Sequence, residues 1–395
     1  MKKKIWGSID TPSLDYVIPK WEIISGKLSD KSERDKASGI YDEIVTSLKG
    51  RKPGEKFTVE KSEVKNLRKL ALELEKIIEP LGLSVRSAGG TGNNKLYYTK
   101  AILGDAIKAR LFGTVGDDDR GQIILKQAKV NGIEVADTGE HLNYTREILL
   151  ITPKGENDRI GAKFPYKEPK VFHNVSKLIE FAKTCDFFYL ESSLIKFIGA
   201  EGFKKFVDEV SANGTKIIFA PPTDKAFFID KNNKPIRSNI EALYYAGEKA
   251  NMITMNETET IHYAGRPLFK ASVTGRNDKN LTTAIDLIRK EFRKFAEKLA
   301  LITVGKHGMI GVTKEFETSV DAALIEKIVN TVGAGDSAAA TVAAIIYGGE
   351  FKGFSKTLVE KAMKLASKVS AAVIGQNPAQ IGVKLVREIT AGRIR

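Results

Sequence analysis

The segment 329–337 holds the residues of this chain best suited to chemistry, because two glycines and an aspartate stand directly before a small, apolar run. It reads Val-Asn-Thr-Val-Gly-Ala-Gly-Asp-Ser, and the run after it predicts a buried helix that opens at Asp336. A glycine-rich turn that leads into a helix points several backbone N–H groups one way, with the helix dipole behind them. Such a turn suits a phosphate, and Asp336 at its rim could take a proton from a hydroxyl group. The alternative is a structural turn with a capping aspartate.

A second pair of glycines, Gly89 and Gly90, lies in Ser-Ala-Gly-Gly-Thr-Gly-Asn-Asn at 87–94, between an expected strand and an expected helix. Glycines there let a ligand approach the backbone closely, and Asn94 offers both a donor and an acceptor to vicinal hydroxyl groups. Taken alone, the segment is explained better by a simple strand-to-helix turn.

A polar segment, Asn-Glu-Thr-Glu at 256–259, follows an expected strand directly. In α/β sheets, ligands bind at the carboxyl ends of strands. Asn256 and Glu259 share a face of the first helical turn and could hold a hydrated Mg²⁺. The same spacing is that of a capping box, and both interpretations can hold together.

Two further turns contain glycines. Gly305 and Gly308 flank a tight turn between two expected strands, which suits a planar base or a phosphate tail. His307 between them is expected to be an exposed turn residue, since nothing else in the sequence marks it as a catalytic base. The segment 112–121 resembles a phosphate loop, but its three acids would repel phosphate. We interpret it as a structural turn with a capping carboxylate.

The composition is that of an ordinary soluble globular protein: 395 residues, 42% hydrophobic and 28% charged, enough for one large domain or two smaller ones. The net charge of +14 is spread as single lysines, without aromatics interleaved with arginines, so no nucleic-acid partner is expected. The single cysteine allows no internal disulfide, and no Cys/His spacing suits zinc. The longest apolar run, near 338–347, is shorter than the ~18 residues of a spanning helix, so we expect no membrane partner and a cytoplasmic location.

Short apolar segments alternate with helical patterns, which predicts an α/β fold with a mostly parallel central sheet covered by helices on both faces. The expected strands are 4–9, 109–115, 148–152, 186–190, 215–220, 252–255 and 301–304. The expected helices are 31–48, 58–80, 120–131, 202–212, 281–299 and 356–374. Residues 16–59 and 133–170 break this rhythm and predict a small β-rich lid with inserted segments. Residues 1–15, 60–132 and 171–395 are assigned to one large domain that binds nucleotide and substrate.

In this order, the segments resemble the ribokinase-like (pfkB) family of carbohydrate and nucleoside kinases, from about Lys4 to Gly375. The run at 330–336 is similar to the family's C-terminal signature, that at 89–94 to its N-terminal signature, and that at 256–259 to its N-x-x-E motif. The resemblance implies a ribokinase-like fold and transfer of a phosphoryl group from ATP to an alcohol, with Mg²⁺. Phosphoryl transfer asks a protein mainly to position an oxygen and to neutralise spreading charge.

For the chemistry itself, the resemblance implies that Asp336 accepts the proton of the substrate's hydroxymethyl group. The backbone of Gly333, Ala334 and Gly335 would form the anion hole over the transferring phosphoryl group. Asn330 stands where the family signature often has an aspartate that helps to hold an activating monovalent cation, so the sequence leaves that activation open.

For the ligands, the resemblance implies three sets of residues. The nucleotide set consists of Asn256, Gly305, Gly308, Thr331, Gly333 and Gly335. The metal set consists of Asn256 and Glu259, acting through water. The substrate set consists of Asp15, Gly89, Gly90 and Asn94, with Asp15 on the ribose hydroxyls. Arg159 in the expected lid would approach the phosphates, and Asp10 replaces a glycine that the family has before its sugar-binding aspartate.

The order of segments around 88–90 is similar to adenosine kinases, and the tail at 369–378 to bacterial inosine-guanosine kinases, so we expect a purine nucleoside as the acceptor. A sugar kinase of the ribokinase or fructokinase type is the alternative, supported by Thr145-Arg146 and the lid-like run at 152–156. A non-catalytic binding subunit is a third, and the intact Asp336 and anion-hole glycines argue against it. The expected assembly is a monomer or a homodimer.

Overall fold

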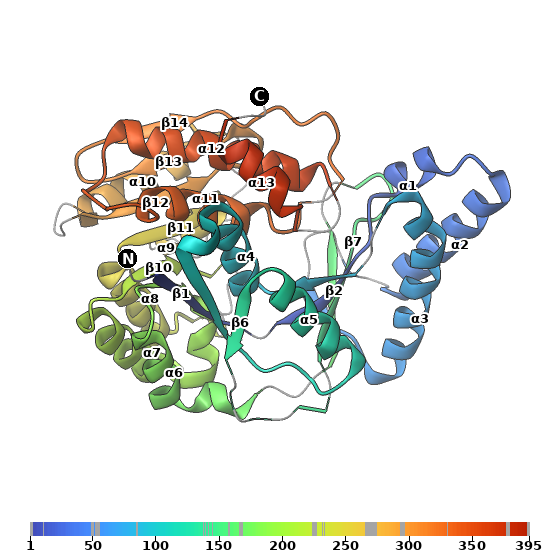
Figure 1. Ribbon diagram of the computed structural model, residues 1–395, viewed down its shortest axis with the longest axis horizontal. Helices are drawn as coiled ribbons and strands as arrows, with labels where there is room; N and C mark the ends of the chain where they lie inside the picture. Colours follow the sequence, from blue (N-terminus) through green and yellow to red (C-terminus); the bar gives the residue numbers. More distant parts are fainter. Residues whose placement is uncertain are drawn as a thin grey trace.

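The protein, seen in a computed structural model, is described over residues 3–392 except for 11, 49–50, 52–55, 84–85, 137, 139, 141, 144, 157–158, 166–168, 223–226, 231, 233, 265–274, 293–296, 330 and 377–379. Two β-sheets with their covering helices make up this part of the chain, a larger one and a smaller one beside it (Figure 1). The expected α/β class is therefore confirmed.

The larger sheet has nine strands within the described residues, in the order β14-β13-β12-β11-β10-β9-β1-β5-β6. Neighbours from β12 to β6 pair in parallel, and β13 and β14 extend one edge as antiparallel strands. The strands are β1 (Lys4–Ile9), β5 (Ile107–Phe112), β6 (Ile133–Ala136), β9 (Phe187–Glu191), β10 (Lys216–Ala220), β11 (Met252–Asn256), β12 (Leu299–Thr303), β13 (Met309–Val312) and β14 (Glu317–Val320).

Both faces of this sheet are buried because successive side chains of a strand point to opposite sides. Phe187 and Tyr189 of β9 join an apolar cluster with α4, α11, α12 and α13, while Phe188 and Leu190 join one with α6, α7, α8 and α10. These helices are α4 (Thr91–Leu103), α6 (Val175–Lys183), α7 (Ile195–Ala212), α8 (Arg237–Lys249), α10 (Lys279–Phe292), α11 (Ala334–Tyr347), α12 (Lys356–Ile374) and α13 (Val383–Thr390). No helix among the described residues has the length and apolar character that crossing a membrane requires.

The smaller sheet has the order β3-β8-β7-β2-β4 and lies beside α1, α2 and α3 (Figure 1). Its elements are β2 (Ser13–Val17), β3 (Lys56–Thr58), β4 (Arg86–Gly89), β7 (Arg146–Ile151), β8 (Ile160–Lys163), α1 (Trp21–Lys27), α2 (Lys31–Ser47) and α3 (Lys61–Ile78). The apolar stripe of α3, including Leu67 and Leu70, packs with Leu14 of β2 and Leu149 of β7. That packing covers one face of the smaller sheet. The side chain of Asp15, which follows Leu14 on β2, lies on the other face.

Among the expectations that differ from the structure, two concern the sheets. The helix expected over 281–299 ends at Phe292, and Leu299 begins β12 by pairing with Met252, so sheet pairing overrides the helical pattern there. Strands β2 and β4 pair within the smaller sheet and β6 within the larger one, which crosses the boundaries expected between large domain and lid. The division into a large domain and a lid stays a prediction.

Candidate active site

Helix α11 begins at a glycine turn and presents its N-terminus to open space. Gly333 is the N-cap residue with a φ of 80°, a left-handed conformation that glycine adopts without strain. No side chain caps this helix within the described residues. A Cβ atom added at Gly335 would meet no atom within 4 Å. The first N–H groups of α11, around Gly333, Ala334 and Gly335, are thus available to an anion.

Asp336, in the first turn of α11, is hydrogen-bonded to the other glycine motif. The Asn94 amide Nδ2 donates to the Asp336 carboxylate Oδ2 at 3.2 Å. Asn94 is fixed in turn by Gln380, whose Nε2 donates to the Asn94 Oδ1 at 3.0 Å. Because α4 packs against α11 on one face of the larger sheet, the two predicted motifs form one site.

Three charged residues that sequence reasoning did not assign to the site lie around this pair. The Lys95 ammonium Nζ is 2.6 Å from the Glu191 carboxylate Oε1. The Asp10 carboxylate Oδ2 accepts from the backbone N–H groups of Gly92 at 2.8 Å and Asn93 at 3.3 Å, at the start of α4. Glu191 ends β9, and its place at the carboxyl end of a parallel strand is the signal that could have identified it.

Burial and neighbouring charges raise the pKa values of two of these acids. Removal from water raises the pKa of Asp336 to about 7, helped by Glu191 and Asp10 and opposed by Lys95 and the Asn94 hydrogen bond. Burial also raises the pKa of Asp10 to about 6, against the nearby Arg146. Burial alone would lower the pKa of Lys95, but Glu191 and Asp336 outweigh it, so that this pKa is raised overall. The site thus holds a carboxyl group, that of Asp336, whose pKa is raised to about 7.

Asp15 lies on β2 directly opposite Ser87 of β4, next to Gly89 and Gly90. Its carboxylate Oδ1 accepts from the Ser13 hydroxyl at 2.6 Å. A Cβ atom added at Gly89 would lie 2.0 Å from the Asp15 Oδ2, so a larger residue there would require the Asp15 carboxylate to move. Gly90 follows as the N-cap residue of α4. The structure thus brings Asp15, Gly89, Gly90 and Asn94 close together, and their binding of a substrate stays a prediction of the resemblance.

Asn256 and Glu259 form a capping box at the start of the short helix α9 (Glu257–Tyr263). The Glu259 N–H donates to the Asn256 Oδ1, and the Asn256 N–H donates to the Glu259 Oε2, each at 2.8 Å. Asn256 is the last residue of β11, and Glu191 is the last residue of β9. Both therefore lie at the carboxyl ends of parallel strands of the larger sheet. Within the described residues, no group of three or more His, Cys, Asp or Glu side chains could hold a metal ion. Magnesium bound through water at these two residues stays a prediction.

The expected turn at Gly305 and Gly308 lies between β12 and β13 as a single 3₁₀ turn, Gly305–His307. Gly308 has a φ of 88°, and a Cβ atom added there would lie 2.1 Å from the Val320 carbonyl oxygen. The turn is a neighbour of α9, since the Glu257 Oε1 is 4.0 Å from the position of a Cβ at Gly305. Gly305 is exposed, so the turn offers backbone to a ligand.

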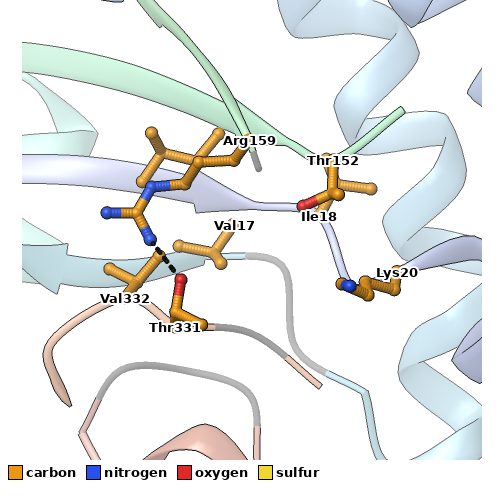
Figure 2. A pocket seen from close by; sticks show the side chains of 8 residues that line it. Val17, Ile18, Lys20, Thr152, Arg159, Thr331 and Val332 are labelled. Atoms are coloured by element: carbon orange, nitrogen blue, oxygen red, sulfur yellow. Dashed lines mark hydrogen bonds between the residues drawn. The ribbon is translucent and has the colours of Figure 1, made fainter. Parts of the chain in front are cut away.

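The smaller sheet meets the glycine-rich turn of α11 at Thr331 and Val332 (Figure 2). Figure 2 shows Arg159 reaching from the smaller sheet, with its Nη1 donating to the Thr331 hydroxyl at 3.2 Å. Val332 packs with Val17 and Leu150 of the two central strands. A cavity of about 10 Å³, large enough for one water molecule, remains between them, with Lys20 at its edge.

The turn at 112–121 has the structural role that we expected. The Asp118 carboxylate accepts from the Gly121 N–H at 2.9 Å and thereby caps α5 (Asp119–Val130). The other carboxylate oxygen of Asp118, Oδ2, accepts from the Thr145 N–H at 3.2 Å, which ties the start of α5 to the start of β7. Asn330, on which the question of a monovalent cation depends, lies outside the described residues.

Solved structures with the same fold come from two groups of kinases. An adenosine kinase from Sinorhizobium meliloti matches with a TM-score of 0.63 at 17% identity, covering 99% of this chain and 99% of that one. A protein from Rhizobium etli described as a sugar kinase matches with a TM-score of 0.64 at 15% identity over 100% of both chains. A protein described as ribokinase II from Escherichia coli, in complex with ATP and Mg²⁺, matches with a TM-score of 0.60 at 15% identity, covering 99% of this chain and 100% of that one. At these identities, the likeness establishes the fold.

Among curated proteins, a 1-phosphofructokinase from Haemophilus influenzae is 25% identical over 185 residues, 47% of this chain. The match spans about half of that relative, 48% of its length. The family model of the pfkB carbohydrate kinases matches residues 82–384. These residues include the Asn94–Asp336 pair, both glycine motifs and the capping box at Asn256, and the match extends over more than half of the chain. The chain therefore belongs to the pfkB family of carbohydrate kinases.

Proposed function

We propose that this protein transfers the γ-phosphoryl group of ATP to the 5′-hydroxymethyl group of a purine nucleoside. The observation that carries the proposal is the Asn94–Asp336 hydrogen bond beside the uncapped N-terminus of α11. A carboxylate and a cluster of N–H groups, held together by rigid helices, are what an in-line phosphoryl transfer needs.

Asp336 would act as the general base. Asn94 donates to the carboxylate Oδ2, which leaves Oδ1 to accept the proton of the substrate hydroxyl group. With a pKa of about 7, a large fraction of Asp336 is ionised at neutral pH, and the acid can also hold the proton after transfer. The N–H groups at Ala334 and Gly335 would receive the phosphoryl oxygens as negative charge spreads over them, with the dipole of α11 behind them.

The residues present fit ATP and Mg²⁺. The exposed turn at Gly305 lies beside α9 and can face a nucleotide with its backbone. Arg159 and Lys20 bring positive charge to the edge of the α11 turn, where phosphates would lie (Figure 2). Mg²⁺ would neutralise phosphate oxygens, and Asn256 and Glu259 would hold its water ligands.

The charges around the acceptor site favour a neutral acceptor. Four carboxylates surround it among the described residues, Asp10, Asp15, Glu191 and Asp336, against two cations, Lys95 and Arg146. A sugar phosphate would bring further negative charge into this excess, which like-charge repulsion disfavours. A nucleoside or an unphosphorylated sugar is uncharged at neutral pH, and carboxylates bind its hydroxyl groups well.

A neutral sugar is the second candidate acceptor. It is favoured by the likeness to the Rhizobium etli protein described as a sugar kinase, which equals the likeness to the adenosine kinase. The same base, anion hole and nucleotide site would serve it, since only the contacts to the rest of the acceptor differ.

The experiment is ADP release from Mg·ATP with adenosine, inosine, guanosine, ribose, fructose and fructose 6-phosphate, with the Asp336→Asn variant as the control. Turnover on a nucleoside that disappears in the variant supports the proposal. Turnover on ribose or fructose alone moves the assignment to the second candidate. Turnover on fructose 6-phosphate contradicts the argument from charge, and no turnover on any acceptor contradicts the proposed function.

A further inference from the structure

A buried ion pair includes Lys95, the chain neighbour of the residue that donates to Asp336, and the proposed function gives this pair no part in the proton transfer. Lys95 follows Asn94 on α4, and its side chain is only 4% exposed; that of Glu191 is 14% exposed. Burying two charges costs several kcal/mol per ion before their attraction repays it, and an apolar pair of similar volume is often as stable. A gain in folding stability therefore does not by itself explain why two charged residues are buried at these positions.

The pair stands among charged groups that come from every element around the site. Asp10 follows β1, Arg146 lies on β7, Glu259 on α9 and Asp336 on α11. Lys95 interacts with Glu191, Asp336 and Glu259, and Glu191 interacts with Asp10 and Asp336. The ammonium of Lys95 is thus placed where carboxylates from three elements converge.

We propose that the Lys95–Glu191 pair positions charge behind Asp336, so that this carboxylate is ionised before the substrate hydroxyl reacts and can still hold the proton afterwards. The proposal rests on the proposed function of Asp336 as the base. Lys95 and Glu191 are positioning residues in this step, because they act on the transfer of the hydroxyl proton through Asp336.

Neither residue alone would serve this purpose. Lys95 without Glu191 would hold Asp336 ionised and make it a weak base, because a carboxylate beside an unopposed buried ammonium gives up its proton readily. Glu191 without Lys95 would keep Asp336 protonated, and a protonated acid cannot accept the hydroxyl proton. Burial is the largest cause of the raised pKa of Asp336; Lys95 lowers this pKa and Glu191 raises it, and with both present it is about 7, near the pH at which a general base works best.

The test compares three variants, Lys95→Met, Glu191→Gln and the double variant, in the pH dependence of kcat/KM for the acceptor identified above. In the wild-type protein, kcat/KM should rise with pH and then level off, and the rising part of this curve is its acidic limb. Lys95→Met should move the acidic limb to higher pH and retain the plateau at high pH. Below pH 7, its kcat/KM should fall about tenfold for every pH unit by which the limb moves. Glu191→Gln should move the limb to lower pH. The double variant should return it close to that of the wild-type protein.

A purely structural role predicts something else: kcat/KM would fall by the same factor at every pH, with the limb unmoved. That result in both single variants overturns the proposal, and so does a double variant whose limb equals that of Lys95→Met. If Lys95→Met does not fold, Glu191→Gln alone decides, because a limb that stays or moves upward contradicts the proposal.

A titration of the Asp336 carboxyl group, which needs no enzymatic turnover, tests this proposal separately from the proposed function. In protein labelled with ¹³C at aspartate carboxyls, Asp336→Asn identifies the Asp336 signal and Asp10→Asn identifies that of Asp10, which also titrates near pH 6. The Asp336 signal should titrate at higher pH in Lys95→Met and at lower pH in Glu191→Gln. An unmoved signal overturns the role of the pair even if the protein turns over a nucleoside. A moved signal upholds it even if no acceptor is found.

Discussion

Asn94 and Asp336 are 242 residues apart in the chain, and the Asn94 Nδ2 donates to the Asp336 Oδ2 at 3.2 Å. The bond joins the first turns of α4 and α11, two helices that cover the same face of the larger sheet. Each helix start carries glycines, and each lies near a set of carboxylates. The bond therefore joins the side of the site that would hold the acceptor to the side that would hold phosphate.

Replacing Asp336 by Asn keeps the shape of the side chain and removes the base. We expect the variant to fold, to bind ATP and to lose turnover by a factor on the order of 10²–10⁴. Steady-state kinetics together with calorimetric titration of ATP provide the measurement. A variant with wild-type kcat would show that another group takes the proton.

The activity of the wild-type protein should depend on pH through Asp336. Its pKa is raised to about 7, and only the ionised form accepts a proton, so kcat/KM should rise tenfold per pH unit below about 7 and level off above it. A pH–rate profile from pH 5 to 9 checks this. An activity that is flat between pH 5 and 7 would contradict the raised pKa.

Gly335→Ala should separate folding from catalysis. The added methyl group would meet no atom within 4 Å, and alanine stabilises a helix relative to glycine by roughly 0.5–1 kcal/mol, so the fold should be kept. The methyl group would project into the space where phosphoryl oxygens should lie, and we expect kcat to fall at least tenfold. Gly39→Ala in α2, which also meets no atom within 4 Å, is the matched control and should leave kcat unchanged.

Arg159→Ala should weaken the binding of ATP. The guanidinium group lies at the edge of the α11 turn, so we expect KM for ATP to rise about five- to tenfold, as for the loss of one charge-assisted hydrogen bond. Lys154→Ala is the control in the same hairpin, because Lys154 pairs with Asp42 and Ser38 instead. Equal effects of the two variants would show that the hairpin matters only for folding.

Asp10 and Asp118 each accept hydrogen bonds from the first N–H groups of a helix, and replacing them by Asn should change the melting temperature at pH 8 in opposite directions. The pKa of Asp10 is raised to about 6, so the folded state binds its proton more tightly, and this stability is present below about pH 4 and lost as the pH rises through 6. Asp10→Asn keeps the cap and should raise the melting temperature at pH 8 but not at pH 4.

Asp118 is the counterpart in that comparison. Burial raises its pKa, but hydrogen bonds from Thr145 and Gly121 and the neighbouring Arg120 outweigh burial and hold it below the ordinary value. Its contribution is present above about pH 4 and lost in acid. Asp118→Asn should therefore lower the melting temperature at pH 8, with a smaller loss at pH 3. Thermal melts of both variants across this range measure the two signs.

The sequence predicted those elements best whose pattern lies within the element itself, and predicted less well those whose bounds depend on distant residues. The bounds of β1 (Lys4–Ile9) and α12 (Lys356–Ile374) agree with expectation, because the short apolar character of the first and the helical stripe of the second lie within the segments themselves. β12 began earlier than expected because its start depends on pairing with Met252, about fifty residues away.

The site shows the same limit. The glycine motifs and Asp336 stood out because their residue types and spacing are unusual. Lys95, Glu191 and Asp10 did not, because a lysine in a helix and a glutamate after a strand are ordinary in sequence. Only the packing of α4 against β1 and β9 places their charges together.

The packing of Val332 against Val17 and Leu150 has a consequence for the pace of turnover. If the acceptor of the proposed reaction enters between the smaller sheet and the α11 turn, these three side chains would have to separate and become exposed to water, and they would have to do so again when the product leaves. Each catalytic cycle by that path would include two separations of this apolar contact. Steps of this kind set the overall rate in many enzymes, and they slow in viscous solvent whereas proton transfer does not.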